Sequence, residues 1–557
     1  MGSIQNFSDL FHGEMLGILI GVSIINGVIL YFASLKFLLA LQQGGYRYKR
    51  YFKWLANPQT PYLSRLMLLC LLAFLFFCVL NTSFAPIVNN GNVTPFVGFA
   101  SYLLFTFAYI KTESSVNAKV PLKKTKRLIR LSVTYILLLI LLTYGLILLL
   151  NFVALKIGNE SFALLRYALL CVMPILSPYV LFLANGINHP FETILKRYYI
   201  NVAKAKIRKY DVIKIGITGS YGKTTVKEIL KTILSQKFRV LSSPESYNTP
   251  LGIALTVKNL DSTHDVLLVE MGARAKGDIK ELAEMVKPQY GVLTGINTQH
   301  FETFGSLQNI KDTKYELFEY LEKDGEGFFS SENSNALELY DKFEGNKFSA
   351  GIAGENNFVT ATNIVTDSRG TTFTLIFKNE PPVQCSTVLL GKHSVSNICL
   401  AAAVAKRLGL TTEEIALGIN RITSIGHRLE LLPNNKNIVI IDDSYNCNED
   451  GIKAAMEVLD TFKGRKIVVT PGLVELGKQE NLANLQFGKM LAGHADIVII
   501  IGKHNAEMLI NGLTEGGMQK SNILFEKNLS RGNETLNSIL REGDVVLFEN
   551  DLPDNYN

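Results

Sequence analysis

The stretch GITGSYGKTTVKEIL, residues 216–230, decides the fold of the second half of the chain. The β-rich run VIKIGIT leads into a turn that contains Gly219 and Gly222, and a helical pattern begins at Lys223. A strand, a glycine-rich turn and a helix in this order bring backbone N–H groups and the positive end of a helix dipole to one place. The stretch therefore predicts a binding site for the phosphates of a nucleotide.

The side chains of this loop suit the same ligand. We expect Lys223 to reach the outer phosphates and the Thr224 hydroxyl to bind Mg²⁺. The spacing differs from the usual Walker A loop, because Ile217 stands six positions before the lysine, where a glycine is expected. The other residues that we predict to bind the nucleotide here are Gly219, Ser220, Gly222 and Thr225.

Around this loop, short β-rich runs alternate with helical stretches. DVLLVEM and YGVLTGI are typical strands, and KGDIKELAEMVK is a typical helix. A second series, NIVIIDD, KIVVTPG, ADIVIIIG and DVVLFEN, begins near residue 437. Such alternation favours parallel sheets with helices on their faces. We predict a central P-loop α/β ATPase domain over 212–425 and a Rossmann-like α/β domain over 426–557.

The composition excludes several classes of protein. The 557 residues are too many for one core, and 48% of them are hydrophobic. The six cysteines form no CxxC pair and no cluster with histidine, so they predict buried thiols and neither a zinc site nor disulfides. The net charge of +7 is explained by basic segments next to apolar runs, which leaves no reason to predict nucleic-acid binding.

The first 190 residues predict an α-helical transmembrane domain. Five apolar runs, at about 15–41, 65–81, 94–110, 131–155 and 167–187, approach the roughly 20 residues that cross a hydrocarbon core. Basic residues follow the first and third runs, whereas the loop NTSFAPIVNNGNVT contains none. The positive-inside rule then places the N-terminus outside and the catalytic domains in the cytoplasm of a multi-pass membrane protein.

The segment 191–211 joins this domain to the α/β part. It includes LKRYYINVAKAKIRKYDV, which is basic and carries interleaved aromatic residues. We expect a juxtamembrane connector that either lies along the cytoplasmic leaflet or forms an ordinary solvated helix.

Several ordered motifs resemble the Mur ligase superfamily, whose members build the peptidoglycan peptide with ATP. These motifs are TGSYGKTT, SYNTPLGIALTV, VEMGARAKGDI, INTQHFETFGS, KDTKYELF, GKHSVSNICLAAAVA, GHRLE and IDDSYNCN. They extend over about 212–550. HFETFGS, DDSYN and VELG are most similar to the branch that adds D-alanyl-D-alanine.

The resemblance implies a role for each matching residue. Glu270 and His300 would bind a second Mg²⁺, with Lys314 as a carbamylated lysine that supplies a further oxygen ligand. Asn397, Arg428 and Asp443 would contact the nucleotide. The residues that would contact the substrate are Asn248, Asn446 and Asn448.

The reaction that the resemblance implies is ADP-forming ligation of a carboxylate and an amine through an acyl phosphate. Lys223, Arg428, His300, Lys314 and two Mg²⁺ would serve the phosphoryl transfer. The acceptor would be a cell-wall precursor, and the amine an amino acid or a dipeptide such as D-alanyl-D-alanine. Other cell-wall enzymes are further possible partners.

The chain departs from the family at the acceptor side. Soluble Mur ligases begin with a domain that binds a UDP-sugar, and here the apolar runs stand in its place. Pro471-Gly472 replaces an expected Gly-Asp pair, and Tyr221 is bulkier than expected in the loop. We therefore expect an acceptor that is lipid-linked or presented at the membrane, with simple anchoring by the helices as the alternative.

Three other functions stay open at this point. A membrane-coupled P-loop ATPase in transport or signalling would need intramembrane charges, and the apolar runs contain no central charged cluster. A folylpolyglutamate-synthase-like ligase is disfavoured by the apolar runs and by the DDSYN form. A non-catalytic scaffold is disfavoured by the retained Lys223, Glu270 and His300.

Overall fold

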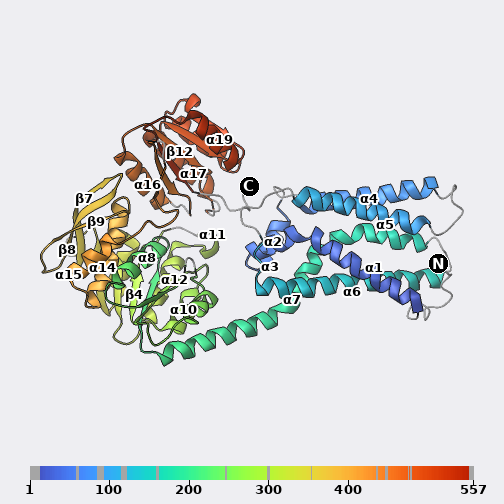
Figure 1. Cartoon of the computed structure of the whole chain (residues 1–557), viewed down its shortest axis with the longest axis horizontal. Coiled ribbons are helices and arrows are strands. Elements are labelled where there is room, and N and C mark those ends of the chain that lie inside the picture. The colour runs from blue at the N-terminus through green and yellow to red at the C-terminus, as the bar shows by residue number, and fades with distance from the viewer. Residues whose placement is uncertain are drawn as a thin grey trace. The chain divides into compact units, whose positions relative to one another are not determined.

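The chain forms two compact units, Met1–Leu195 and Lys196–Asn557 (Figure 1). The structure is a computed structural model of the whole chain. It describes residues 13–57, 62–84, 93–114, 122–157, 162–244, 247–297, 301–352, 354, 356–434, 437–445, 449–474, 476 and 479–550.

The described part of the first unit consists of helices and short connecting segments. The helices are α1 (Gly13–Ala33), α2 (Leu35–Gln43), α3 (Tyr48–Leu55), α4 (Tyr62–Phe84), α5 (Val93–Ser114), α6 (Lys126–Ile157) and α7 (Phe162–Lys209). The last of these continues into the second unit. The predicted connector at 191–211 is therefore mostly the end of one long helix, although Pro174, Pro178 and Pro190 lie inside it.

Two helices in the described part are long and apolar enough to cross a membrane, over Tyr62–Leu80 in α4 and Lys126–Leu150 in α6. A third candidate combines two helical segments, Leu19–Ala33 of α1 and the whole of α2, which meet at an angle of 52°. Together they would make one further span. These three correspond to the first, second and fourth predicted runs. The prediction of five crossings stays a prediction.

Polar side chains buried between these helices bond to one another. The Tyr135 hydroxyl donates to Ser34 Oγ at 2.7 Å and to the Ser177 carbonyl at 3.0 Å. The Asn26 amide donates to Thr143 Oγ1 at 3.0 Å. Since an unpaired polar group in an apolar interior is unfavourable, such pairs favour one arrangement of the helices over others.

The second unit begins with a nine-stranded sheet in the order β2-β3-β1-β4-β5-β6-β7-β8-β9. The strands from β2 to β7 are parallel, and β8 and β9 add antiparallel strands at one edge. The strands are β1 (Ile213–Thr218), β2 (Val240–Ser242), β3 (Val266–Glu270), β4 (Tyr290–Leu293), β5 (Glu326–Ser330), β6 (Asn346–Gly351), β7 (Val359–Asp367), β8 (Gly370–Phe377) and β9 (Val383–Thr387).

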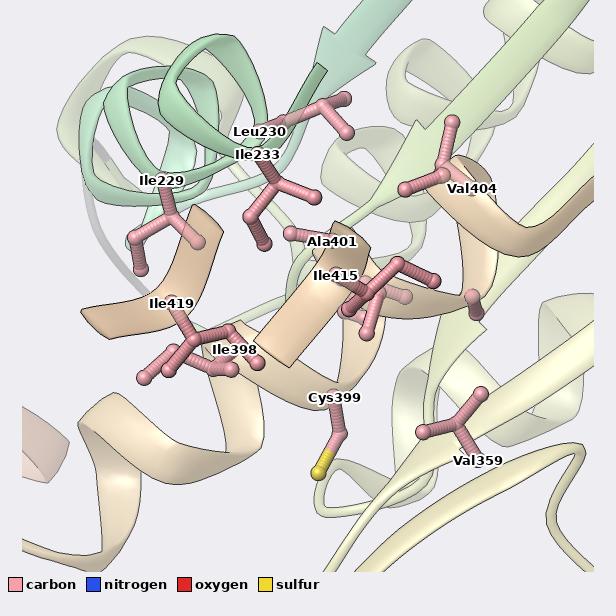
Figure 2. Close-up of a cluster of buried hydrophobic side chains, with 14 of the residues drawn as sticks. Ile229, Leu230, Ile233, Val359, Ile398, Cys399, Ala401, Val404, Ile415 and Ile419 are labelled. Carbon is pink, nitrogen blue, oxygen red and sulfur yellow. The ribbon is translucent and has the colours of Figure 1, made fainter. Parts of the chain in front are cut away.

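Helices cover this sheet, and two apolar cores result. The helices are α8 (Lys223–Leu234), α9 (Pro250–Val257), α10 (Asp278–Val286), α11 (Phe301–Phe304), α12 (Leu307–Glu319), α13 (Ser334–Lys342), α14 (Lys392–Arg407) and α15 (Thr412–Asn420). One core joins α8, α14 and α15, where Ile229, Ile398 and Ile419 lie close together (Figure 2). The other core includes α9, α10 and α12.

A second sheet of six strands follows, in the order β10-β11-β15-β12-β13-β14. Only the β10–β11 pair is antiparallel. The strands are β10 (Glu430–Leu432), β11 (Val439–Asp443), β12 (Lys466–Thr470), β13 (Ile497–Ile501), β14 (Ile523–Glu526) and β15 (Val545–Glu549). Its helices are α16 (Glu449–Thr461), α17 (Glu480–His494), α18 (Ala506–Glu515) and α19 (Leu529–Ile539), with a short 3₁₀ turn at Lys520–Asn522.

The predicted pair of α/β domains is thus present. The five cysteines that the structure describes are free, and four of them are buried, as the sequence predicted. The exact domain limits proposed from the sequence remain predictions.

We expect Ile398→Ala to destabilise the second unit by about 2–5 kcal/mol, because the side chain is fully buried between α8, α14 and α15. The single tryptophan, Trp54, lies in the first unit. Hydrogen-exchange mass spectrometry of α8 and α14 peptides in urea is therefore the suitable measurement. The matched control is Leu417→Ala on α15, whose side chain is 47% exposed and should change stability by at most about 0.5 kcal/mol. Equal effects of the two substitutions would contradict the packing.

Candidate active site

The turn between β1 and α8 needs glycine at two positions. Gly219 has φ +153°, and a Cβ there would lie 2.1 Å from Thr294 Oγ1. Gly222 has φ +75° and lies next to the first residue of α8. The Ser220 N–H donates to the Gly295 carbonyl at 2.7 Å, which ties the turn to the segment after β4. The turn stands at the carboxyl end of β1, between β3 and β4, where parallel sheets commonly bind ligands.

Lys223 opens α8 and folds back over the turn. Its Nζ donates to the carbonyls of Gly219 at 2.9 Å and Ser220 at 3.0 Å. Burial lowers the pKa of Lys223, the Glu270 carboxylate opposes that shift, and Arg428 adds to it. Two cations, Lys223 and Arg428, therefore act on the same place, which favours a multiply charged anion there.

Glu270, at the end of β3, is the acidic group beside this turn. Its side chain is only 2% exposed, and Cα of Ile217 on β1 is its partner in the sheet. The Thr224 hydroxyl donates to Glu270 Oε2 at 2.8 Å, and the Asn248 amide donates to Oε1 at 3.0 Å. A hydroxyl and a carboxylate are oxygen ligands of the kind that Mg²⁺ uses together with phosphate oxygens, so these residues fit that ion.

Lys227 is a member of this cluster that sequence reasoning missed. The side chain is fully buried, and its Nζ donates to the Ser243 carbonyl at 2.8 Å. The same Nζ lies 3.3 Å from Glu228 Oε1 and 4.0 Å from Glu270 Oε2. A buried carboxylate is stabilised by such a cation. The VKE tripeptide after the loop was the available signal, but no local pattern shows that its lysine points inward.

Lys314 lies on α12 with only 3% of its side chain exposed. Its pKa is lowered to about 7, mainly by burial and further by Lys223. Three carboxylates, those of Asp278, Glu270 and Glu316, partly oppose this shift. An exposed lysine on a helix would keep its usual pKa, so the tertiary fold gives this amine an unusual property.

On the nucleotide side, Asn397 of α14 lies against the turn. A Cβ at Gly222 would be 3.2 Å from Asn397 Oδ1. Thr225, in the first turn of α8, is half-buried. These positions agree with the predicted nucleotide contacts without testing them.

Arg428 and Asp443 lie together in the second sheet's domain. The Leu429 N–H donates to Asp443 Oδ1 at 3.2 Å, and the Arg428 guanidinium lies 4.5 Å from the centre of the Tyr445 ring. Burial raises the pKa of Asp443 to about 6, although Arg428 acts in the opposite direction. The neighbouring His427 bonds to Asp442 at 2.7 Å between Nδ1 and Oδ2, which orders the start of this segment.

A side-chain contact joins the two α/β domains within the second unit. The Asn297 amide donates to Asp450 Oδ2 at 3.1 Å. Asn297 also contacts the turn between β1 and α8, because its N–H donates to Ser220 Oγ at 3.2 Å. The turn between β1 and α8 is thus connected through Asn297 to α16.

Tyr221, the bulky residue in the loop, is accommodated by its surroundings. Its ring packs on Gly295, where a Cβ would lie 2.6 Å from the tyrosine Cζ. The Asn333 amide donates to its hydroxyl at 3.3 Å, and burial raises the pKa of Tyr221 to about 12. The Thr294 hydroxyl donates to its carbonyl. The side chain is an anchor for the turn.

Pro471-Gly472 forms a tight turn after β12. Gly472 has φ +85°, and a Cβ there would lie 2.5 Å from Asn484 Oδ1. Three buried asparagine side chains hold this turn by bonds to its backbone: Asn484, Asn505 and Asn550. Pro471-Gly472, which stands where a Gly-Asp pair was expected, is therefore held in place by specific hydrogen bonds of this domain.

His300, Asn446 and Asn448 lie outside the described residues. Within the residues that the structure does describe, no three histidine, cysteine, aspartate or glutamate residues come together as a metal site. The described part of the site consists of cations and oxygen ligands around the glycine-rich turn between β1 and α8. Such an arrangement is suited to phosphoryl transfer.

Comparison with known proteins agrees with this site. The pattern of the Mur ligase middle domain matches residues 217–405, and that of the Mur ligase glutamate ligase domain matches 427–549. The UDP-N-acetylmuramoyl-tripeptide--D-alanyl-D-alanine ligase of Escherichia coli is 30% identical over 337 residues, which are 59% of this chain and 73% of that protein. The Bacillus subtilis ligase of the same name is 28% identical over 356 residues, 62% of this chain and 75% of its own.

Solved structures show the same fold. MurF from Acinetobacter baumannii has a TM-score of 0.58 at 24% identity and covers 64% of this chain and 77% of its own. MurF from Thermotoga maritima, solved with ADP, has a TM-score of 0.58 at 23% identity, with 64% and 80% covered.

The fold and the phosphate-binding turn define a class of ATP-dependent enzymes with two α/β domains. The chain belongs to the Mur ligase family, whose members are ADP-forming amide ligases that use ATP and Mg²⁺.

We expect Thr224→Val to lower kcat for ADP formation by about 10²–10³-fold and to raise the Mg²⁺ concentration that gives half the maximal rate. The substitution removes the hydroxyl beside Glu270 and keeps a similar side-chain volume. Thr232→Val is the matched control, because its hydroxyl bonds to the Glu228 carbonyl of the same helix at 3.0 Å and not to Glu270. An unchanged Mg²⁺ dependence in Thr224→Val would contradict the assignment.

Proposed function

We propose that the chain is a membrane-bound ligase that joins an amine to a peptide-stem carboxylate of a cell-wall precursor through an acyl phosphate. The observation that carries this proposal is the meeting of Lys223, Thr224, Glu270 and Lys314 at one edge of the first sheet. The names of the similar ligases support the substrate class.

In the first step, an oxygen of the acceptor carboxylate attacks the γ-phosphorus of ATP, and ADP leaves. Lys223 and Arg428 would balance the negative charge that builds up on the phosphoryl oxygens. Thr224 and Glu270 would bind Mg²⁺, with a second ion held by Glu270, His300 and Lys314. When bound, the metal would neutralise phosphate and carboxylate charge.

In the second step, the neutral amine attacks the acyl carbon, inorganic phosphate leaves with the C–O bond electrons, and the ammonium proton passes to solvent. The acyl phosphate must be kept from water. Arg428 and Asp443 come from the second α/β domain, so closure of that domain on the first would complete the site. Asn297 and Asp450 already bond between the two domains.

Lys314 is proposed to carry a carbamate. Its neutral amine would add to CO₂ to form an N–C bond with loss of one proton, which converts a cation beside Glu270 into an oxygen ligand. The lowered pKa supports this, because only a neutral amine reacts.

The two substrates that the ligase would join are an amine and an acceptor carboxylate. The similar ligases are named for D-alanyl-D-alanine and UDP-N-acetylmuramoyl-tripeptide. We propose a peptide-stem acceptor that is lipid-linked, since apolar helices stand before the ligase domains. The Pro471-Gly472 turn, close to the end of β12, would influence the choice of amine, and Asn248, Asn446 and Asn448 would contact substrate.

The first unit is proposed to sit in the cytoplasmic membrane with the ligase domains in the cytoplasm. Its helices expose many large apolar side chains, among them Leu71, Leu75, Leu137 and Leu141, at 49–62%. Large exposed apolar surfaces of this kind fit a lipid environment.

The carbamate predicts a specific pH dependence. With a folded-state pKa of about 7, the neutral fraction of Lys314 should rise from roughly a tenth at pH 6 to roughly nine tenths at pH 8. Carbon-13 NMR with labelled bicarbonate should therefore show a carbamate that grows over this range and vanishes in Lys314→Met. The exposed Lys280 is the internal comparison, because its pKa is raised and its amine stays protonated. A carbamate that persists in Lys314→Met would contradict the assignment.

Acceptor use is tested with the purified protein in lipid nanodiscs. We expect ADP formation that requires both a muropeptide acceptor and an added amine, with lipid-linked acceptor used faster than the UDP-linked form. Lys223→Ala is the inactive control. Turnover with the UDP-linked form alone would refute the lipid-linked acceptor, and ADP formation without any amine would favour a membrane-coupled ATPase.

A further inference from the structure

The outer face of α7 beyond Pro190 has no role in the chemistry above. Residues 193–210 contain six cations and no acid. These cations are Lys196, Arg197, Lys204, Lys206, Arg208 and Lys209. So strong an excess of positive charge on one stretch of helix indicates an anionic partner.

The inner face of this stretch is fixed to the ligase domain. Ile200, Ala203 and Ile207 are buried in the core that also holds α9, α10 and α12. Lys196 pairs with Glu281 at 2.9 Å, and Lys206 Nζ donates to the Lys258 carbonyl at 2.6 Å. The end of α7 is thus part of the second unit.

The outer face is apolar as well. Ile194, Tyr198 and Val202 are 66%, 61% and 47% exposed and stand four residues apart. At 3.6 residues per turn, a spacing of four keeps side chains on one line, and Tyr198 points about 160° away from Ile200. An ordinary solvated helix would carry polar residues along this line.

We propose that this outer face lies on the surface of an anionic lipid bilayer, as an interfacial helix. An apolar line flanked by lysine and arginine is the pattern by which such helices bind headgroups and the upper acyl region. A second copy of this chain is the other candidate, but it would bring the remaining cations of both chains, Arg197, Lys204, Arg208 and Lys209, to one interface, where they repel. This inference rests on the proposed membrane embedding of the first unit.

Pro190 marks the start of this stretch. A proline inside a helix removes one backbone hydrogen bond and commonly permits a bend. Because the inner face belongs to the ligase core, contact of the outer face with lipid would hold the active-site domain at the membrane. An acceptor carried by a lipid would then be presented close to the ligase.

The test uses the full chain in nanodiscs, with an environment-sensitive fluorescent amino acid introduced by amber suppression at Tyr198 or Val202. Nitroxide-labelled lipids quench a probe only where it meets the bilayer. We expect several-fold stronger quenching at both positions than at Asn201 in anionic nanodiscs, and a clear loss of quenching in zwitterionic ones. Asn201 is exposed and lies one residue from Val202, so it is the matched control.

A probe at Leu141 of α6 reports the embedding of the first unit separately. If Leu141 is quenched while Tyr198 and Val202 behave like Asn201, the inference is wrong. If the probes are shielded in both lipid compositions and energy transfer occurs between copies, a second chain covers the face and the inference is also wrong. An unquenched Leu141 would overturn the embedding, and this inference with it. If ADP formation did not depend on an added amine, the proposed ligase function would be wrong, and the quenching result for α7 would still stand.

A double variant tests the consequence for activity. Tyr198→Glu with Val202→Glu should reduce the ligase rate several-fold in anionic nanodiscs and leave the rate in detergent unchanged, since neither residue lies in the active site. Asn201→Glu should have a much smaller effect. Equal rates in anionic nanodiscs for the unsubstituted protein, the double variant and Asn201→Glu would show that contact of this face with lipid does not affect activity.

Discussion

The buried carboxylate of Glu270 is the constraint on which the active site depends. A charge with 2% exposure is stable only if other groups compensate for the lost water. Thr224, Asn248 and Lys227 supply that compensation, and they come from α8 and from the segment before α9. Because β3 lies directly beside β1 in the sheet, the carboxylate reaches the phosphate-binding turn. The sheet order is therefore a condition for the chemistry.

Positively charged side chains also lie near this end of the sheet, and their charge favours the binding of an anionic ligand. Lys223 and Arg428 belong to different domains, yet Arg428 lowers the pKa of Lys223, and Lys223 in turn lowers the pKa of Lys314. Burial brings the pKa of Lys314 to about 7 and leaves this amine partly neutral near physiological pH. This neutral form is the one that the proposed carbamate on Lys314 would require.

The helix α7 begins in the helical first unit and ends in the second unit. Its early part is apolar, while its last turns bury Ile200, Ala203 and Ile207 in the ligase core. Burial of these three side chains stabilises the attachment of the helix to the second unit. The last turns of α7 therefore belong to the second unit.

The sequence by itself determined the α/β character, the glycine-rich turn between a strand and a helix, and the family, since each depends on residues that are contiguous or in a fixed order. Continuous apolar runs likewise located helices of the first unit. Only the tertiary structure decided that Lys227 and Lys314 are buried, that Gly295 makes room for Tyr221, and that α7 continues to Lys209. These features depend on partners far apart in the chain, which no local pattern contains. A lysine's environment is set by what packs over it, and packing is decided by the assembled sheet and helices.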